Sequence, residues 1–195
     1  MRAKTLQGLG CAAAVKISSP ATSHAPEALD FSKLAPFLRV LLVTDGVVTR
    51  ILDAYFAEPI DVNVLSHIEV RSESCYPDID VNVGDRIVSR CVVLRGHVTQ
   101  RPYAFASSIL VSDFLPKQLR RRLVEDRKGI GELLSCSRLE TYREIIAIGQ
   151  GEAGELAGHL AVAPDSCVVS RTYKIHLHGT AVMLIKETFS KAMFE

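Results

Sequence analysis

Two charged residues stand at apolar positions of strand-like segments in this chain, and they limit the folds that it can adopt. Side chains at positions i, i+2 and i+4 of a β-strand share one face. Arg90 alternates with Val88, Val92 and Leu94, and Glu187 alternates with Ala181, Met183, Ile185 and Phe189. Because a charge leaves water only at a high cost, a buried guanidinium or carboxylate needs a partner, which can be the other charge, main-chain groups or a charged ligand. The pattern therefore predicts an enclosed anion-binding pocket.

A third charge, Arg171, follows the same pattern, since it shares a strand face with Tyr173, Ile175 and Leu177. Three such charges on three strands are unusual for an inert core. Two alternatives remain open from the pattern alone. One strand could lie at a sheet edge or be shifted in phase, or arginine and glutamate could form a plain buried ion pair.

The alternation belongs to a chain of one-domain size, with 195 residues of which 48% are hydrophobic and 23% charged. We expect a single domain over residues 29–195 and a flexible N-terminal tail over residues 1–28. The first 26 residues contain no Asp or Glu. That composition is typical of a loose extension or of a transit segment, and we favour the extension.

Charge and cysteine content exclude several classes of protein. The formal net charge is +1, which gives no overall attraction to nucleic acid or to an anionic membrane. No apolar run reaches the roughly 20 residues of a membrane span. Five widely spaced cysteines without a Cys-x-x-Cys pair predict neither a disulfide framework nor a zinc site. A cytoplasmic protein without metal is the expectation.

The order of segments predicts the fold class. Strands are expected at Ile60–Val70, around Arg90, at Tyr103–Val111, at Val168–Leu177 and at Ala181–Phe189, with helices after Leu115-Pro116 and from Gly129. Leu38–Thr44 and Leu139–Ile148 fit either a strand or a helix, and glycines from Gly149 to Gly158 predict a loop-rich stretch. Hairpin-like strands with two helices in mid-chain predict an α+β domain around an antiparallel sheet.

Other reactive side chains lack a supporting pattern. His176 and His178 share a strand face, but no third metal ligand has a recognisable spacing, so we expect polar-face histidines. Ser107 and Ser108 lack the context of a catalytic serine. The arginines at 120–122 point in different directions on a helix, so a solvated face is favoured over a nucleic-acid surface.

From about Leu38 to Phe189 the chain resembles the chorismate pyruvate-lyases that form 4-hydroxybenzoate. The resemblance rests on the order and spacing of Val43–Arg50, Ser89–Gly96, Phe105–Ser108, Leu115-Pro116, Gly129–Leu134, Leu139–Glu144, Ser170-Arg171 and Lys186–Phe189. It implies a single antiparallel sheet with helical flaps over an internal ligand cavity. The effector-binding domains of certain bacterial transcription regulators have a similar fold.

The resemblance also implies roles for individual residues. Arg90 matches the arginine that binds the ring carboxylate of chorismate, helped by the main-chain amides of Val47 and Ile130. Glu187 matches the carboxylate beside the ether or hydroxyl oxygen at the other end of the ring. Arg171 is the candidate for the second carboxylate of the substrate, with Arg143 as the alternative. No cofactor is expected, because loss of pyruvate aromatises the ring, and the expected partners are the small-molecule substrate and its products.

Two questions of mechanism and class stay open at this level. Among apolar neighbours Glu187 is expected to have a raised pKa and to donate a proton or hydrogen bond to the ether oxygen, or else only to polarise that oxygen during an intramolecular hydrogen shift. The rival to a lyase is a non-catalytic sensor of small aromatic acids. A sensor would normally carry a DNA-binding helix-turn-helix, for which the tail is short.

Overall fold

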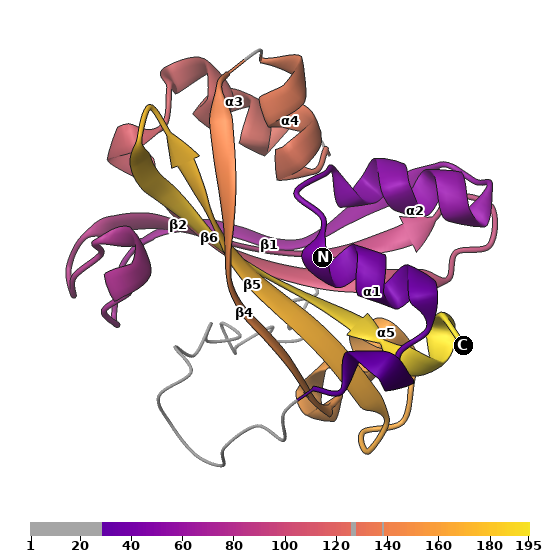
Figure 1. The fold of residues 1–195 in the computed structure, drawn as a ribbon. Coiled ribbons are helices and arrows are strands. Elements are labelled where there is room, and N and C mark those ends of the chain that lie inside the picture. The colour runs from indigo at the N-terminus through magenta and orange to yellow at the C-terminus, as the bar shows by residue number, and fades with distance from the viewer. Residues whose placement is uncertain (1–28, 126–127, 138) are drawn as a thin grey trace, which may run out of the picture.

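The computed structural model describes residues 29–125, 128–137 and 139–195, so the predicted tail lies outside the described residues. Six antiparallel strands form one sheet in the order β1-β2-β3-β6-β5-β4 (Figure 1). The strands are β1 (Ile60–Arg71), β2 (Arg86–Gly96), β3 (Pro102–Val111), β4 (Thr141–Glu152), β5 (Cys167–Leu177) and β6 (Thr180–Ser190). The predicted α+β class with an antiparallel sheet is confirmed.

The sheet consists of two runs of hairpins joined at its centre. Strands β1, β2 and β3 pair in sequence, and so do β4, β5 and β6. The β3–β6 pairing, in which Ala106 lies opposite Glu187, joins the two runs. Because of this pairing, Arg90 on β2 and Glu187 on β6, which are far apart in the sequence, lie in one sheet with only β3 between their strands.

Helices lie on both sides of the sheet. On one side are α1 (Pro36–Val43), α2 (Val48–Phe56), α3 (Lys117–Glu125) and α4 (Ile130–Cys136), and on the other is α5 (Ala157–Leu160) (Figure 1). The ambiguous segment Leu38–Thr44 is thus mainly helical, and the two mid-chain helices are confirmed as α3 and α4. None of the helices in the described residues is long and apolar enough to cross a bilayer.

Leucines at a spacing of four residues dock α3 against the sheet. Leu115, Leu119 and Leu123 are all buried in one apolar cluster with Leu133 of α4. A fully buried leucine side chain stabilises a fold by roughly 1.5–3 kcal/mol relative to an exposed one. The α3–α4 pair is therefore held by its apolar face, as the spacing predicts.

We call the sheet face that carries Arg90 and Glu187 the cavity face. Two separate apolar clusters lie between this face and the helices. One cluster packs α1 and α2 over Val92, Leu94 and Phe189. The other packs α3 and α4 over residues such as Val88, Leu110 and Ile175. The charged residues lie where the two clusters meet, between two pairs of helices that we call the α1–α2 flap and the α3–α4 flap.

Glu58 fastens the end of the α1–α2 flap to the β2–β3 turn. Its carboxylate accepts hydrogen bonds of 2.9 Å from the main-chain N–H groups of Val98 and Thr99, and others from the Thr99 and Tyr103 hydroxyls. The hydrogen bonds from Thr99 and Tyr103 lower the pKa of Glu58 to about 2, so the carboxylate stays ionised. A Cβ at Gly96 would overlap the Glu58 carboxylate, so this position favours glycine.

One expectation about the second half of the chain is wrong. The glycine-containing stretch after Ile148 is not all loop, because β4 runs through Gly149 and Gly151 to Glu152. A Cβ at either glycine would meet nothing within 4 Å, and β4 is an edge strand. Glycine is therefore not required there for space, and pairing with β5 outweighs its weak strand propensity.

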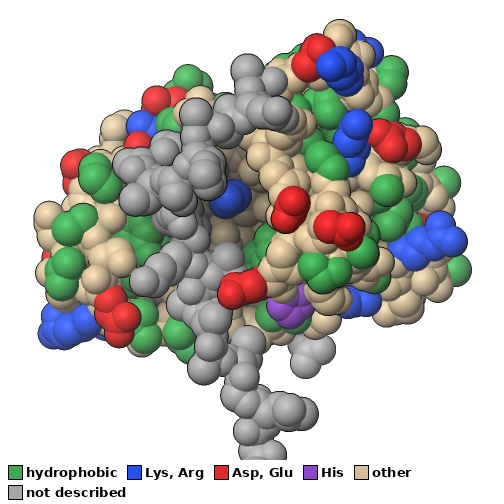
Figure 2. Space-filling view, turned by 90° about the horizontal axis from the view of Figure 1, so that it is seen from below, with side chains coloured by type: hydrophobic (Ala, Val, Ile, Leu, Met, Phe, Trp, Pro, Cys, Tyr) green, Lys and Arg blue, Asp and Glu red, His purple; other side chains and the backbone are tan. Residues whose placement is uncertain are grey.

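The visible charges follow the near-neutral composition. Figure 2 shows both acidic and basic side chains on the face seen from below, without an extended patch of either sign among the coloured residues. On this face the charges thus give no broad attraction for anions.

Candidate active site

A cavity of about 540 Å³, its mouth included, lies between the two flaps and the sheet. Its sheet side is lined by Arg90, Ser108, Arg143, Tyr173 and Glu187 with several apolar residues. Its upper side is lined by residues 46–49 at the start of α2 and residues 129–131 at the start of α4. A pocket is therefore present at the predicted place, and Arg90 and Glu187 both line it.

Arg90 is buried without a counter-ion in the part of the chain that the structure describes. Its side chain is 1% exposed, and Nη2 donates a hydrogen bond of 2.9 Å to the Lys128 carbonyl. Its Nε is buried without a hydrogen-bond partner, and no carboxylate among the described residues pairs with the guanidinium. Burial lowers the pKa of Arg90, although an arginine remains charged at physiological pH. A buried cation with spare donors that lines a cavity is suited to bind an anion.

Glu187 is 6% exposed and is held from two sides. Arg171 Nε donates to Glu187 Oε2 at 2.7 Å, and the Tyr173 hydroxyl donates to Oε1 at 3.1 Å. Burial and the neighbouring Glu187 charge raise the pKa of Tyr173 well above its usual value, so the hydroxyl keeps its proton. Besides the expected apolar neighbours, Glu187 thus has a guanidinium and a phenol beside it. Both donate to its carboxylate, so Glu187 accepts hydrogen bonds.

Arg171 is as buried as Arg90, at 1% exposed, but it is paired with a carboxylate. Besides the bond to Glu187, its Nη1 donates to the main-chain carbonyl of Thr44 at the end of α1. Arg171 is not among the residues that line the cavity. The structure thus contains the buried ion pair that was one of the open alternatives, and Arg171 positions Glu187.

Arg143 does line the cavity, from the edge strand β4. Its Nη1 donates a 2.9 Å hydrogen bond to the carbonyl of Asp45, in the loop between α1 and α2. A Cβ placed on Gly131 would lie 3.3 Å from Arg143 Nη2, so the guanidinium also lies close to the α3–α4 flap. Arg143 therefore stands at the place where both flaps and the sheet edge meet.

The main-chain N–H groups of Val47 and Ile130 face no protein acceptor among the described residues. Val47 precedes α2 and Ile130 is the first residue of α4, where helical N–H groups lack an intrahelical partner. Both residues line the cavity. The two flaps can thus add main-chain donors to the same space as Arg90.

Sequence reasoning missed His67, which lies directly opposite Arg90 on β1. Burial and then the charge of Arg90 lower the pKa of His67, and its Nδ1 is buried without a partner. The register of β1 shifts between Val64 and Ser66, so His67 replaces Ser66 on the cavity face. Simple alternation from Val64 would have placed Ser66 there, so the pattern gave no signal for His67.

The remaining candidates lie away from this centre or have a structural role. His176 Nε2 lies 2.9 Å from Glu144, and no group of three or more metal-ligating side chains occurs in the described part of the chain. The Ser108 hydroxyl lines the cavity and donates to the carbonyl of Arg90 at 3.2 Å. The polar side chains of the lining residues thus comprise two guanidinium groups, one carboxylate and the hydroxyl groups of Thr49, Ser108 and Tyr173.

Residues 42–195 match the sequence profile of a family described as "Chorismate pyruvate-lyase Rv2949c-like". A protein of Mycobacterium leprae named chorismate pyruvate-lyase is 28% identical over 167 residues, which cover 85% of this chain and 80% of that protein. The protein of the same name from Mycobacterium tuberculosis is 26% identical over 173 residues, or 85% of each chain.

The fold is also similar to that of solved structures with other roles. The effector domain of PhnF from Mycobacterium smegmatis superposes with a TM-score of 0.61 at 12% sequence identity, over 77% of this chain and 91% of that domain. At this identity the likeness concerns the fold alone. It agrees with the expected similarity to effector-binding domains of transcription regulators.

Proposed function

Since the chain belongs to the Rv2949c-like family of chorismate pyruvate-lyases, we propose that it converts chorismate to 4-hydroxybenzoate and pyruvate. The observation that carries this proposal is the unpaired guanidinium of Arg90 in the cavity that also contains Glu187. A small anion that enters this cavity meets a cation at one end and an oriented carboxylate at the other.

Arg90 binds the ring carboxylate in this proposal. A guanidinium pairs with a carboxylate through two parallel N–H donors, and the strength of such a pair increases when water is excluded. Val47 and Ile130 line the same cavity, and in this proposal their main-chain N–H groups add two donors from the flaps. Binding of the ring carboxylate would thus draw both flaps toward the sheet.

Glu187 orients the other end of the ring. Because Arg171 and Tyr173 both donate to it, Glu187 is arranged as an acceptor, which suits a hydrogen bond from the ring hydroxyl of chorismate. This arrangement supports the mechanism in which Glu187 polarises the substrate over the one in which it donates a proton. The ether C–O bond then breaks, the ring carbon that bears the hydroxyl loses its hydrogen, and the methylene of the leaving enolpyruvate gains one to give pyruvate.

The chain itself supplies position and surroundings for this reaction. Aromatisation of the ring provides the driving force, so the protein needs to hold a reactive conformation and exclude water. Apolar residues such as Val92, Ala106 and Ile185 line the cavity between the charged groups. These apolar side chains help to exclude water from the cavity.

The experiment that tests the proposal mixes the purified protein with chorismate and measures 4-hydroxybenzoate and pyruvate together. We expect both to appear in equal amounts, and the Arg90→Met variant to produce neither above background. Tight binding of 4-hydroxybenzoate without turnover would instead support the rival sensor.

A further inference from the structure

We propose that Arg143 binds the second carboxylate of the substrate and thereby selects dianions over monoanions. The inference rests on the proposed function, since chorismate carries one carboxylate on its ring and one on its enolpyruvyl group. It assigns a specificity role to a residue at the mouth of the cavity.

A second cation is required by the charge of the substrate. A carboxylate that leaves water without a partner is strongly disfavoured, and Arg90 can pair with only one of the two. Arg171 does not meet this need, because its charge is paired with Glu187 and it does not line the cavity. Among the described residues that line the cavity, Arg90 and Arg143 are the basic side chains.

Arg143 has donors to spare. Among the described residues its guanidinium makes one hydrogen bond to an acceptor, from Nη1 to the Asp45 carbonyl, and no described carboxylate pairs with it. A guanidinium has five N–H donors, so most of the fork remains for a ligand. Gly131 permits the close approach, since a Cβ there would lie 3.3 Å from Nη2.

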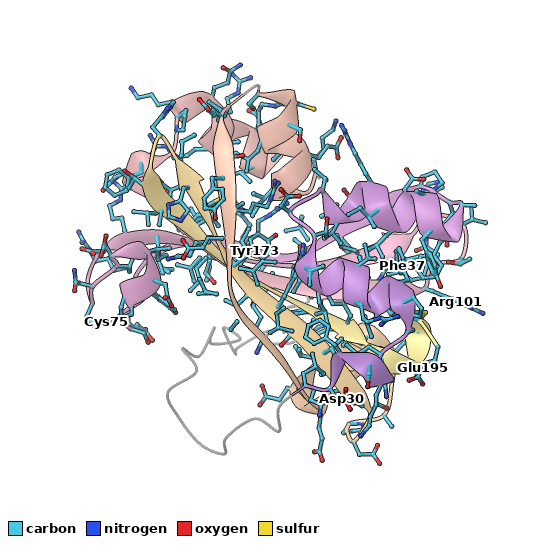
Figure 3. All side chains as sticks on the ribbon, viewed as in Figure 1. Asp30, Phe37, Cys75, Arg101, Tyr173 and Glu195 are labelled. Carbon is cyan, nitrogen blue, oxygen red and sulfur yellow. The ribbon has the colours of Figure 1, made fainter. Side chains whose placement is uncertain are left out.

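The two arginines stand at opposite ends of the cavity. Arg90 is on β2 and Arg143 on β4, with β3, β6 and β5 between them. Four strand spacings of ~4.8 Å separate the two backbones by about 19 Å along the sheet. Both long side chains reach into the cavity from these ends. Glu187 is on β6, which is the middle strand of the five from β2 to β4, so it lies between the strands of the two arginines. Tyr173, on β5, donates to it (Figure 3).

In this arrangement each product is bound by a different arginine. The ring carboxylate stays with Arg90 after the ether bond breaks, whereas the carboxylate held by Arg143 departs with pyruvate. A monoanion such as 4-hydroxybenzoate then uses Arg90 alone. Removal of Arg143 should therefore weaken substrate binding and leave product binding unchanged.

The test compares two stable probes, 4-hydroxybenzoate and 3-(carboxymethoxy)-4-hydroxybenzoate, which adds an ether-linked carboxylate. Calorimetry measures both affinities for the wild type, for Arg143→Gln and for Arg101→Gln. Arg101 is exposed and lies at the far end of the β2–β3 hairpin, so it controls for loss of one positive charge (Figure 3). We expect Arg143→Gln to weaken the dianion by about ten- to a hundredfold and the monoanion less than twofold. The Arg101 variant should change neither.

Two results would overturn the inference. Equal weakening of both probes would make Arg143 a structural latch between the flaps, and unchanged dianion affinity would remove it from the site. In a parallel assay, the KM for chorismate should rise in Arg143→Gln while inhibition by 4-hydroxybenzoate stays constant. Failure of the wild type to release pyruvate would contradict the proposed function, yet the ratio of the two probe affinities would still decide the role of Arg143.

Discussion

Two equally buried arginines of this sheet have opposite surroundings. Arg171 gives its Nε to Glu187 and its Nη1 to the Thr44 carbonyl, so it forms part of the folded core. Arg90 gives one hydrogen bond to the Lys128 carbonyl and keeps a buried Nε without a partner. Both are 1% exposed, so burial alone does not distinguish a structural charge from a binding charge. Their partners make the distinction.

The largest expected effect concerns stability at Arg171. Arg171→Met should lower the free energy of unfolding by about 3–5 kcal/mol, because it leaves Glu187 as an uncompensated buried charge. Urea denaturation followed by circular dichroism measures this loss. The double variant Arg171→Met/Glu187→Met should recover most of it. A single variant as stable as the wild type would show that the two arginines do not differ in this respect.

Arg90→Met should have the opposite profile. We expect the binding free energy of 4-hydroxybenzoate to become less favourable by about 2–5 kcal/mol, because the substitution removes the cation that pairs with a desolvated carboxylate. Stability should change little or increase, because Arg90 has no counter-ion among the described residues. Calorimetry and denaturation on one protein sample give both numbers. Unchanged affinity would rule out Arg90 as the carboxylate site.

Glu187→Gln tests the residue that connects the two arginines, because Glu187 pairs with Arg171 and lines the same cavity as Arg90. The amide keeps the size of the carboxylate but loses its charge, so we expect turnover of chorismate to fall by about a hundredfold. Product affinity should change much less, because Arg90 binds the carboxylate. Wild-type turnover in this variant would mean that Glu187 only balances Arg171.

The smallest effect is a pH dependence near Arg90. The folded protein lowers the pKa of His67, through burial and the charge of Arg90, from an ordinary value of 6.5. As the pH falls below 6.5, the unfolded chain is protonated at this residue while the folded protein is still neutral there. Proton binding therefore favours the unfolded chain, and the free energy of unfolding decreases until the pH reaches the lower pKa of the folded protein. His67→Gln should lose this part of the decrease between pH 7.5 and 5.5. An identical slope in wild type and variant would contradict the assignment.

The sequence allowed the fold to be predicted from repeated alternation. Five strands and the two mid-chain helices were predicted, and burial of Arg90, Arg171 and Glu187 followed from strand parity. The edge strand β4 stayed ambiguous because most of it is half-buried, so its alternation is weak. Local patterns are strongest where one face is fully buried.

The site could be predicted only in part. Parity places a charge on a face but does not say which charges meet, since that depends on the register between β5 and β6. The Arg171–Glu187 pair and the position of His67 after the register shift in β1 are both consequences of pairing. The residue that lines the cavity mouth, Arg143, lies on the strand that the sequence left undecided.

The central β3–β6 pairing has a consequence for the order of folding. Phe105 pairs with Thr188 across this seam, whereas the other neighbouring strands are consecutive in the chain. Local hairpins form early, and contacts between distant segments carry a larger entropic cost of closure. Arg90 and Glu187 come from opposite sides of the seam, so neither half of the sheet contains the cavity alone. Ligand recognition would therefore be acquired late in folding, when the two halves dock.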